Sequence, residues 1–233
     1  MNCFLDYRVS DEELNNIYKL NLNPIIVPKT NLVYPAINGH VDIQLSIIDK
    51  INKKIIVHND MDTLFLKELT KNNINYIKSK NHLGYNYPNN IMLNSLILNT
   101  LFIHNTKYSD PTLLECIKDK KIINVKQGYT KCSILPLNNK AIITNDVGIA
   151  KKMILEGIDV LHLPYGDIEL PSFDYGFIGG VGGMINDNTL ALFGELSHYS
   201  YGKEIYEFTK KHKIDVISLK RKKLTDRGSL LVI

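Results

Sequence analysis

The sequence predicts an α/β fold of five ββαβ units, each a strand hairpin followed by a helix and a short apolar strand. Three observations lead to this prediction. Hairpin patterns recur along the chain, the intervals between them are nearly equal, and the last one needs a segment from each end. The predicted hairpins occupy Val41–Val57, Ile91–Ile103, Cys132–Thr144 and Gly183–Phe193, and the fifth is divided between Gly228–Ile233 and Cys3–Tyr7.

The first unit combines β-branched runs with a polar turn. Runs rich in Ile and Val are typical of strands, and the polar segment Asp49–Lys53 between two of them indicates a hairpin. Asp62 stands where a helix cap is expected, because its carboxylate can accept hydrogen bonds from the first free backbone N–H groups. The predicted elements are strands Val41–Ile48 and Lys54–Val57, helix Thr63–Thr70 and strand Ile74–Ile77.

The second unit repeats this order and marks its helix start more strongly. Pro111 follows the predicted cap Asp110. Proline suits the first helical position, because the backbone N–H that it lacks would have no partner there. The predicted strands of this unit are Asn90–Leu98, Leu101–His104 and Ile122–Val125.

The third and fourth units have short hairpins with asparagine-containing turns, a residue type favoured in turns. Gly157 predicts the end of the third helix, since glycine readily takes the left-handed backbone found there. The third unit comprises strands Ser133–Leu137 and Ala141–Thr144, a helix over about Ile149–Glu156 and strand Ile158–Leu163. The fourth comprises Met184–Ile185, Thr189–Phe193, a helix over about Gly202–His212 and strand Ile214–Leu219.

The fifth unit requires both ends of the chain. Ser229–Ile233 is a predicted strand with nothing after it to complete a hairpin, and Cys3–Tyr7 supplies the missing strand. Ser10 and Glu13 then form a capping box, in which each residue satisfies a backbone N–H near the other. A helix to about Leu20 and a strand at Ile25–Val27 complete the unit.

The spacing of the hairpins supports five equivalent units. The steps between the hairpin ends at Asn59, Asn105, Asn145 and Gly194 are 46, 40 and 49 residues, and the step through both chain ends to Tyr7 is 46. Units arranged as a ring share one axis, on which groups near the hairpin starts converge. The alternative is an ordinary α+β domain whose strands and helices simply alternate.

Length and composition limit the classes of function. A chain of 233 residues with 44% apolar residues can bury a large core, and we expect a single domain over residues 1–233. The net charge of +4 is mild, and aromatic residues are not interleaved with basic ones, so no nucleic-acid partner is expected. The basic run Lys220–Lys223 could attract phosphate, but a solvated turn is the simpler interpretation.

Neither membrane insertion nor secretion is expected. No segment approaches ~18 consecutive apolar residues, and Met1–Asp6 lacks the basic and apolar regions of a secretory signal. Cys3, Cys116 and Cys132 are odd in number and form no CxxC pair. This pattern argues against a disulfide framework or a zinc cage and favours the reducing cytoplasm. No cofactor and no metal site are predicted, and the oligomeric state stays open.

Three motifs stand near hairpin starts: Gly39-His40-Val41-Asp42, Cys132 within Tyr129–Ser133, and Asp226-Arg227-Gly228-Ser229. A ring of ββαβ units with these motifs resembles the α/β-propeller of the penteins, the guanidino-modifying superfamily. Its members include arginine deiminase, agmatine deiminase, dimethylargininase and the amidinotransferases. The resemblance implies a five-bladed, pseudo-symmetric propeller over the whole chain. Its start would be circularly shifted, so that the N-terminus closes the last unit.

The resemblance also implies roles for four residues. Cys132 would be the nucleophile, and His40, two units earlier as in the dimethylargininases, would be the acid and base. Asp42 would pair with the planar guanidinium through two parallel hydrogen bonds. Asp226, which stands in place of a family Glu, would orient His40 and contact substrate. The segment 177–184 lacks a further substrate-binding acid that the family has there, so the substrate stays open.

The chemistry explains why these residue types would be needed. The guanidinium carbon is a poor electrophile because of resonance, so a thiolate is the natural nucleophile. His40 would protonate the departing amine and then activate water against the covalent thiouronium intermediate. Hydrolysis would give a ureido product, whereas transfer to a second amine would make the protein an amidinotransferase.

Each of these residues also has a purely structural interpretation. Cys132 could be a small buried residue at a strand start. His40 and Asp42 could be a hydrogen-bonded pair that steadies a turn, and Asp226 could serve the turn at Gly228.

Other polar and glycine positions are assigned no chemistry. His58, His104 and His198 follow strands and are expected to be surface or loop residues. The glycines at 179, 180, 182 and 183 lack the order of a phosphate-binding loop and are expected to allow close packing of the backbone.

The sequence therefore favours a cytoplasmic hydrolase or amidinotransferase acting on a small, arginine-like guanidino compound. The alternative is a non-catalytic protein of the same fold, similar to a ribosome anti-association factor. For that role, Lys220–Lys223 would be the candidate binding surface.

Overall fold

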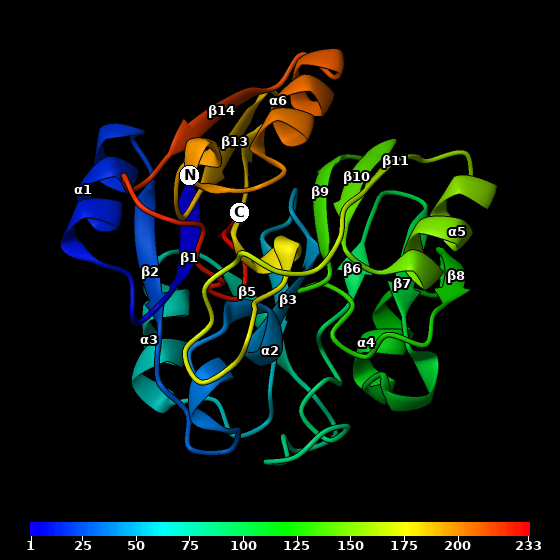
Figure 1. The fold of residues 1–233 in the computed structure, drawn as a ribbon. Coiled ribbons are helices and arrows are strands. Elements are labelled where there is room, and N and C mark those ends of the chain that lie inside the picture. The colour runs from blue at the N-terminus through cyan, green and yellow to red at the C-terminus, as the bar shows by residue number, and fades with distance from the viewer.

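The computed structural model describes residues 1–233, and its strands form five separate three-stranded sheets. Every sheet contains an antiparallel pair and a parallel pair, and a helix precedes the parallel third strand (Figure 1). Four sheets come from continuous segments. The first contains β3 (Leu45–Asp49), β4 (Lys54–Val57) and β5 (Asn75–Lys78), and the second contains β6 (Leu96–Ile97), β7 (Leu101–His104) and β8 (Lys121–Asn124). The third contains β9 (Ile134–Asn138), β10 (Ala141–Thr144) and β11 (Asp159–His162), and the fourth contains β12 (Gly182–Asn186), β13 (Thr189–Leu192) and β14 (Asp215–Ser218). The predicted five-unit α/β repeat is confirmed.

The fifth sheet joins the two ends of the chain. Its strands are β15 (Leu231–Val232), β1 (Asn2–Asp6) and β2 (Asn23–Val27), in that order. Cys3 lies opposite Val232, and Asn2 and Ile233 exchange two backbone hydrogen bonds of 2.9 Å. Figure 1 accordingly shows the N and C labels close together. The predicted pairing of the last strand with the N-terminal segment is therefore confirmed.

The unit helices lie on the periphery of the molecule in Figure 1, outside the strands. They are α1 (Asp11–Lys19), α3 (Thr63–Lys71), α4 (Pro111–Cys116), α5 (Val147–Leu155) and α6 (Gly202–Lys211). The capping box at α1 is present, since Ser10 N donates to Glu13 Oε2 at 2.7 Å and Glu13 N donates to Ser10 Oγ at 3.3 Å. The caps predicted at Asp62 and Asp110 are also observed. Asp146 caps α5, which therefore begins two residues before the predicted start.

The apolar core consists of five clusters, and each cluster joins two consecutive units. Along β1, the side chains alternate between two of them: Phe4 packs with the first unit, and Cys3 and Leu5 pack with the fourth. This alternation follows from the two-residue period of a strand. The other three clusters join the first and second, the second and third, and the third and fourth units. Apolar burial thus connects every unit to both of its neighbours.

Three predicted strands begin at least two residues later in the structure. Val41–Gln44 is a one-turn helix, α2, and only the part from Leu45 is a strand. The predicted strand Asn90–Leu98 is reduced to Leu96–Ile97, and Ser229–Ile233 is reduced to Leu231–Val232. The residues before these strands are all buried, and several of them are apolar. Burial alone does not distinguish a strand from a turn. These turns carry the hairpin starts on which the candidate site depends.

Two histidine predictions were wrong. His58 and His104 are buried, with 1% and 0% of their surface exposed, and only His198 is exposed as expected, at the end of the short helix Leu196–His198. His104 Nδ1 lies 2.6 Å from the hydroxyl of Ser109, which gives one of its two ring nitrogens a partner. None of the helices combines the length and the apolar character needed to cross a membrane.

Candidate active site

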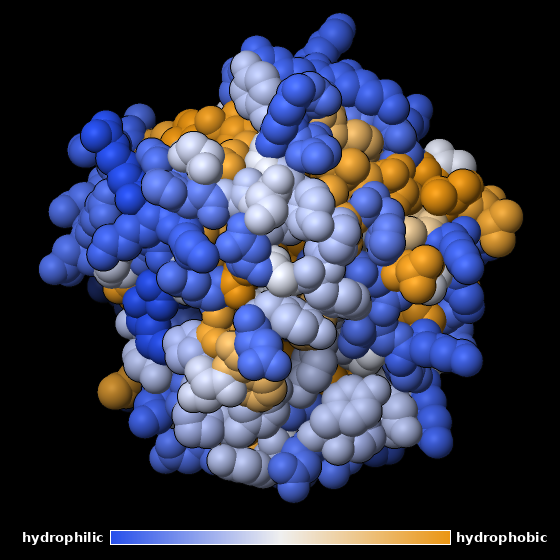
Figure 2. Space-filling view, viewed as in Figure 1, coloured by the Kyte–Doolittle hydropathy of each residue, from blue (hydrophilic) through white to orange (hydrophobic).

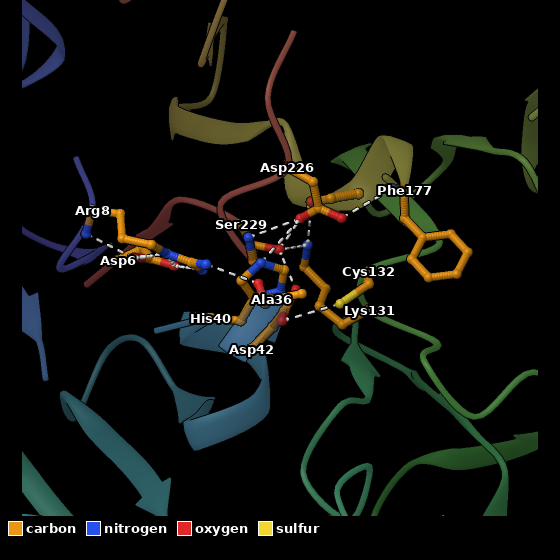
Figure 3. Close-up of polar contacts among 12 residues, drawn as sticks. Asp6, Arg8, Ala36, His40, Asp42, Lys131, Cys132, Phe177, Asp226 and Ser229 are labelled. Carbon is orange, nitrogen blue, oxygen red and sulfur yellow. Dashed lines mark hydrogen bonds and ion pairs between the residues drawn. The ribbon is translucent and has the colours of Figure 1, made fainter. Parts of the chain in front are cut away.

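The structure brings the four predicted site residues together from three different units. His40 and Asp42 lie at α2, Cys132 lies just before β9, and Asp226 lies shortly before β15 (Figure 3). A ring nitrogen of His40, a carboxylate oxygen of Asp42 and Cys132 Sγ lie within 4.8 Å of one another. His40 Nε2 lies 3.7 Å from Asp226 Oδ1. The hairpin starts therefore converge, as the ring of units predicts.

His40 is held tightly but has free ring nitrogens. It is 1% exposed, and neither ring nitrogen has a hydrogen-bond partner in the protein. The turn at Gly228 packs against it so closely that a Cβ at Gly228 would overlap the Cβ of His40. Gly228 also has a φ of 66°, which favours glycine. Buried polar atoms without partners are rare, which marks His40 as a candidate functional residue.

The N-terminal strand supports the segment before His40. Arg8 donates to the Asp6 carboxylate and, through Nη1, to the Ala36 carbonyl at 2.9 Å (Figure 3). A Cβ at Gly39 would overlap Asp6 Oδ1, so glycine is needed for this close approach. The end of β1 thus positions the turn that carries His40.

Asp226 is buried beside His40 and is bound by backbone donors. Its carboxylate accepts hydrogen bonds from the backbone N–H groups of Phe177 and Gly228, both at 2.9 Å. Burial raises the pKa of Asp226, while His40 and the two N–H groups oppose that rise. A Cβ at Gly180 would overlap Asp226 Oδ1, which supports the interpretation of the 179–183 glycines as packing positions.

Cys132 is a buried thiol with two polar neighbours. It is 2% exposed, its Sγ donates to Asp42 Oδ1 at 3.2 Å, and Asn94 Nδ2 lies at the same distance from Sγ. Burial, followed by the charges of Asp42 and Asp226, raises the pKa of Cys132 well above its ordinary value. The sulfur is therefore protonated before a ligand binds. A cation placed beside it would favour the thiolate.

Lys131, a buried lysine, is linked to Asp42 and Cys132 by hydrogen bonds, and no sequence pattern indicated it. Lys131 Nζ donates to Ser229 Oγ at 2.8 Å and to the carbonyls of Gly179 and Ile134 at 3.3 and 3.4 Å. Ser229 Oγ in turn donates to Asp42 Oδ2 at 2.7 Å (Figure 3). One chain of hydrogen bonds thus runs from Lys131 through Ser229 and Asp42 to Cys132.

A cavity of about 260 Å³ opens above these groups. Cys132, His40 and Asp226 line its base, whereas Asp42 lies behind Cys132 and is not among the lining residues. The other lining residues are mostly aromatic or apolar: Tyr34, Ile37, Tyr129, Leu170, Phe173, Asp174, Tyr175 and Phe177. The cavity is small compared with drug-sized sites, so it fits a compact ligand.

Five of the lining residues come from one long loop, residues 163–177, between β11 and β12. In Figure 1 this yellow segment passes across the middle of the molecule. Figure 2, from the same side, shows mostly pale and blue residues over the middle of this face. The loop supplies Asp174, an acid that no motif indicated near 177–184.

His40, Asp42 and Cys132 also offer the nitrogen, oxygen and sulfur donors that transition metals bind. Both carboxylate oxygens of Asp42 already accept hydrogen bonds, from Cys132 and Ser229. That the site works without a metal stays a prediction.

Two solved structures share this fold. One is SxtG, an amidinotransferase from Microseira wollei in the saxitoxin biosynthetic pathway, with a TM-score of 0.55 and 11% identity over 93% of this chain and 75% of that chain. The other is C. jejuni agmatine deiminase, with a TM-score of 0.51 and 13% identity over 94% of this chain and 86% of that chain. Both are penteins, so the chain has the pentein fold that its motifs resemble.

The chain belongs to the family of unknown function DUF6873, whose model matches residues 4–231. No curated protein matches the sequence.

Proposed function

We propose that this protein modifies a small guanidino compound, as a hydrolase or an amidinotransferase, with Cys132 as the nucleophile. One observation carries the proposal. The thiol of Cys132, the unpaired ring of His40 and the Asp226 carboxylate line the base of one cavity. The two structural neighbours are an amidinotransferase and an agmatine deiminase, which agrees with this chemistry.

The whole chain, residues 1–233, acts in this proposal as one domain, a five-bladed propeller that is closed by β1 and β15. Support comes from the five core clusters, which link each unit to both neighbours, including the fifth unit to the first and the fourth. The three cysteines are free, which agrees with a reducing compartment such as the cytoplasm. Neither a nucleic acid nor a membrane is a partner in this proposal.

The acidic groups bind the substrate cation. A guanidinium presents parallel N–H groups that carboxylates accept in pairs. Asp226 faces the cavity, and Asp42 lies next to the sulfur that would attack the guanidinium carbon. Aromatic faces such as those of Tyr34 and Phe177 line the same space and attract cations.

The bound cation activates the nucleophile. Its positive charge offsets the effect of Asp42 and Asp226, which together with burial keeps Cys132 protonated. The thiol proton passes to His40, which has a ring nitrogen within 4.8 Å of Cys132 Sγ, as sulfur attacks the guanidinium carbon. His40 then gives a proton to the departing amine, and a C–N bond breaks to leave the thiouronium intermediate.

The second half of the reaction decides the class of enzyme. In a hydrolase, water replaces the amine and His40 takes its proton, so that a ureido product and the free thiol are formed. In an amidinotransferase, a second amine attacks instead and carries the amidino group away. Asp226, 3.7 Å from His40 Nε2, orients the imidazole in both cases.

Labelling with 2-chloroacetamidine, a guanidine-like thiol reagent, tests the nucleophile. We expect one adduct, on Cys132, and slower labelling when a guanidine occupies the cavity. The uncharged 2-chloroacetamide is the matched reagent, and it should show no such preference for Cys132. Cys3 and Cys116 are internal controls, because neither lines the cavity. Labelling of either one in place of Cys132 would remove the assignment.

Turnover is tested with a panel of guanidines. Arginine, methylated arginines, agmatine and guanidinoacetate are each incubated with the protein, with and without an acceptor amine. Ammonia, released amine and ureido product are then measured. A ureido product without an acceptor identifies a hydrolase, and product only with an acceptor identifies a transferase.

The alternative, a non-catalytic binding protein, depends on the basic run Lys220–Lys223. The structure uses part of that run internally. Lys220 is 7% exposed and donates to Thr225 Oγ1 at 2.6 Å, and Lys223 pairs with Asp167 at 3.1 Å. A Cys132 that resists chloroacetamidine, together with no turnover, would favour this alternative.

A further inference from the structure

The cavity has two chemically different ends. Its base is closed, since His40, Cys132 and Asp226 are each no more than 2% exposed. Its mouth is open, with Phe173 52% and Tyr175 41% exposed, and Asp174 lies between these two rings in the sequence. A substrate whose reacting group reaches Cys132 therefore places its other end near Asp174.

No lysine or arginine lines the cavity. Lys131, although it adjoins Cys132, is buried, and its ammonium group donates to three protein acceptors. A ligand carboxylate would lose water on entry without gaining a cationic partner, which is costly. It would also meet the like charge of Asp174.

Asp174 is free to bind a cation. Its carboxylate is exposed and makes no hydrogen bond or ion pair with the rest of the protein. The rings beside it are arranged in pairs, with Tyr34 and Phe173 centroids 5.7 Å apart and Tyr165 and Tyr175 centroids 5.3 Å apart. Ring faces attract cations and also pack against methylene chains.

The loop that carries Asp174 is anchored on both sides of it. Glu169 N donates to Leu224 O at 2.8 Å, and Asp226 N donates to Glu169 O at 2.9 Å. On the other side, Gly176 N donates to Ile168 O at 2.8 Å and Phe177 N donates to the Asp226 carboxylate at 2.9 Å. The segment that holds Asp226 at the base therefore also fixes the position of the acid at the mouth.

We propose, on the basis of the proposed function, that the substrate is a guanidine with a cationic amine and no carboxylate at its far end. Asp174 is the residue that selects this amine. The two acids of the cavity then meet the two cations of the substrate, Asp226 at the guanidinium and Asp174 at the amine. A flexible methylene chain between them lies against the aromatic walls.

Protection of Cys132 from chloroacetamidine measures binding whether the protein is a hydrolase or a transferase. Four ligands share the guanidinium and differ in the tail: agmatine (amine), butylguanidine (neutral), arginine (amine and carboxylate) and arginine methyl ester (masked carboxylate). We expect agmatine to give half-protection at a concentration at least about tenfold below that of arginine. Arginine methyl ester, whose carboxylate is masked, should give half-protection at a concentration much closer to that of agmatine.

The variant Asp174→Asn removes the proposed selectivity. It should weaken the binding of agmatine about fivefold relative to that of butylguanidine. This is the upper range for the loss of an ion pair that solvent can reach. Asp174→Lys should reduce or reverse the preference for agmatine over arginine. Asp187→Asn is the matched control, since Asp187 is an exposed acid in the β12–β13 turn and lies outside the cavity.

The outcomes separate this inference from the proposed function. If arginine protects Cys132 better than agmatine does, or if Asp174→Asn weakens all four ligands equally, the substrate class is wrong and the cysteine chemistry stands. If Cys132 is not labelled and no guanidine is turned over, both are wrong.

Discussion

Replacing Lys131 with methionine tests whether the buried Lys131 ammonium stabilises the pair formed by Asp42 and Cys132. The Lys131 ammonium donates to Ser229 and to two backbone carbonyls, and Ser229 donates to Asp42, the neighbour of Cys132. Methionine has a similar length and no charge, so the change removes the cation with little change in volume. Any large effect then comes from the lost charge and hydrogen bonds.

The expected cost is about 3 kcal/mol in the free energy of unfolding. Each of the two buried carbonyls loses a donor, at about 1 kcal/mol apiece. Asp42 loses a compensating charge, which costs about 3 kcal/mol when one partner of a buried pair is removed. Burial of the lysine is itself unfavourable, as the lowered pKa of Lys131 indicates. Relief of that burial offsets part of the loss.

Urea unfolding at pH 7 of the wild type, Lys131→Met, Asp42→Asn and the double variant measures the coupling. We expect the double variant to be about 2 kcal/mol more stable than the sum of the single effects, because a neutral amide at position 42 needs no cation. Lys140→Met, on an exposed turn, is the control and should change stability by less than about 0.5 kcal/mol. Single effects that add within about 0.5 kcal/mol would refute the coupling.

Four further predictions concern the site and the core. Cys132→Ala should abolish turnover and change the free energy of unfolding by about 1 kcal/mol or less in urea; a much larger loss would mark Cys132 as a core residue. Gly228→Ala should destabilise by about 2 kcal/mol or more, because φ is 66° and the new Cβ would meet His40; an unchanged urea midpoint would contradict this. Burial lowers the pKa of both His58 and His104 to about 4. As pH falls below 6.5, the unfolded chain therefore takes up protons first, and stability should fall between about pH 6.5 and 4 by up to about 3 kcal/mol per histidine. In His104→Gln this pH slope should be shallower, and an identical slope would count against neutral burial. Dialysis against EDTA should leave turnover unchanged. If turnover is lost and added zinc restores it, the protein requires a metal.

Features coded within a few residues could be predicted from the sequence. The Ser10–Glu13 capping box and the Asp110-Pro111 helix start rest on local hydrogen-bond geometry, and both are present. The pairing of the two chain ends was also predictable, because the repeat left one strand without a partner at each end. The convergence of the hairpin starts on one cavity followed from that repeat.

Features set by distant neighbours could not be predicted. Lysine is usually a surface residue, and the tertiary contacts of Lys131 with Ser229 and Gly179 offset part of the cost of its burial. His58 follows β4 and His104 ends β7, positions that did not indicate burial, yet both side chains are buried. Asp174 comes from a loop without periodicity, so no pattern could place it at the cavity.

β1 is synthesised long before β15, the strand with which it pairs. The ribosome makes the first strand more than two hundred residues before its antiparallel partner. Until then, the apolar side chains of Cys3, Phe4 and Leu5 have only part of their final packing. Such distant pairing slows folding and prolongs the time in which a growing chain can aggregate.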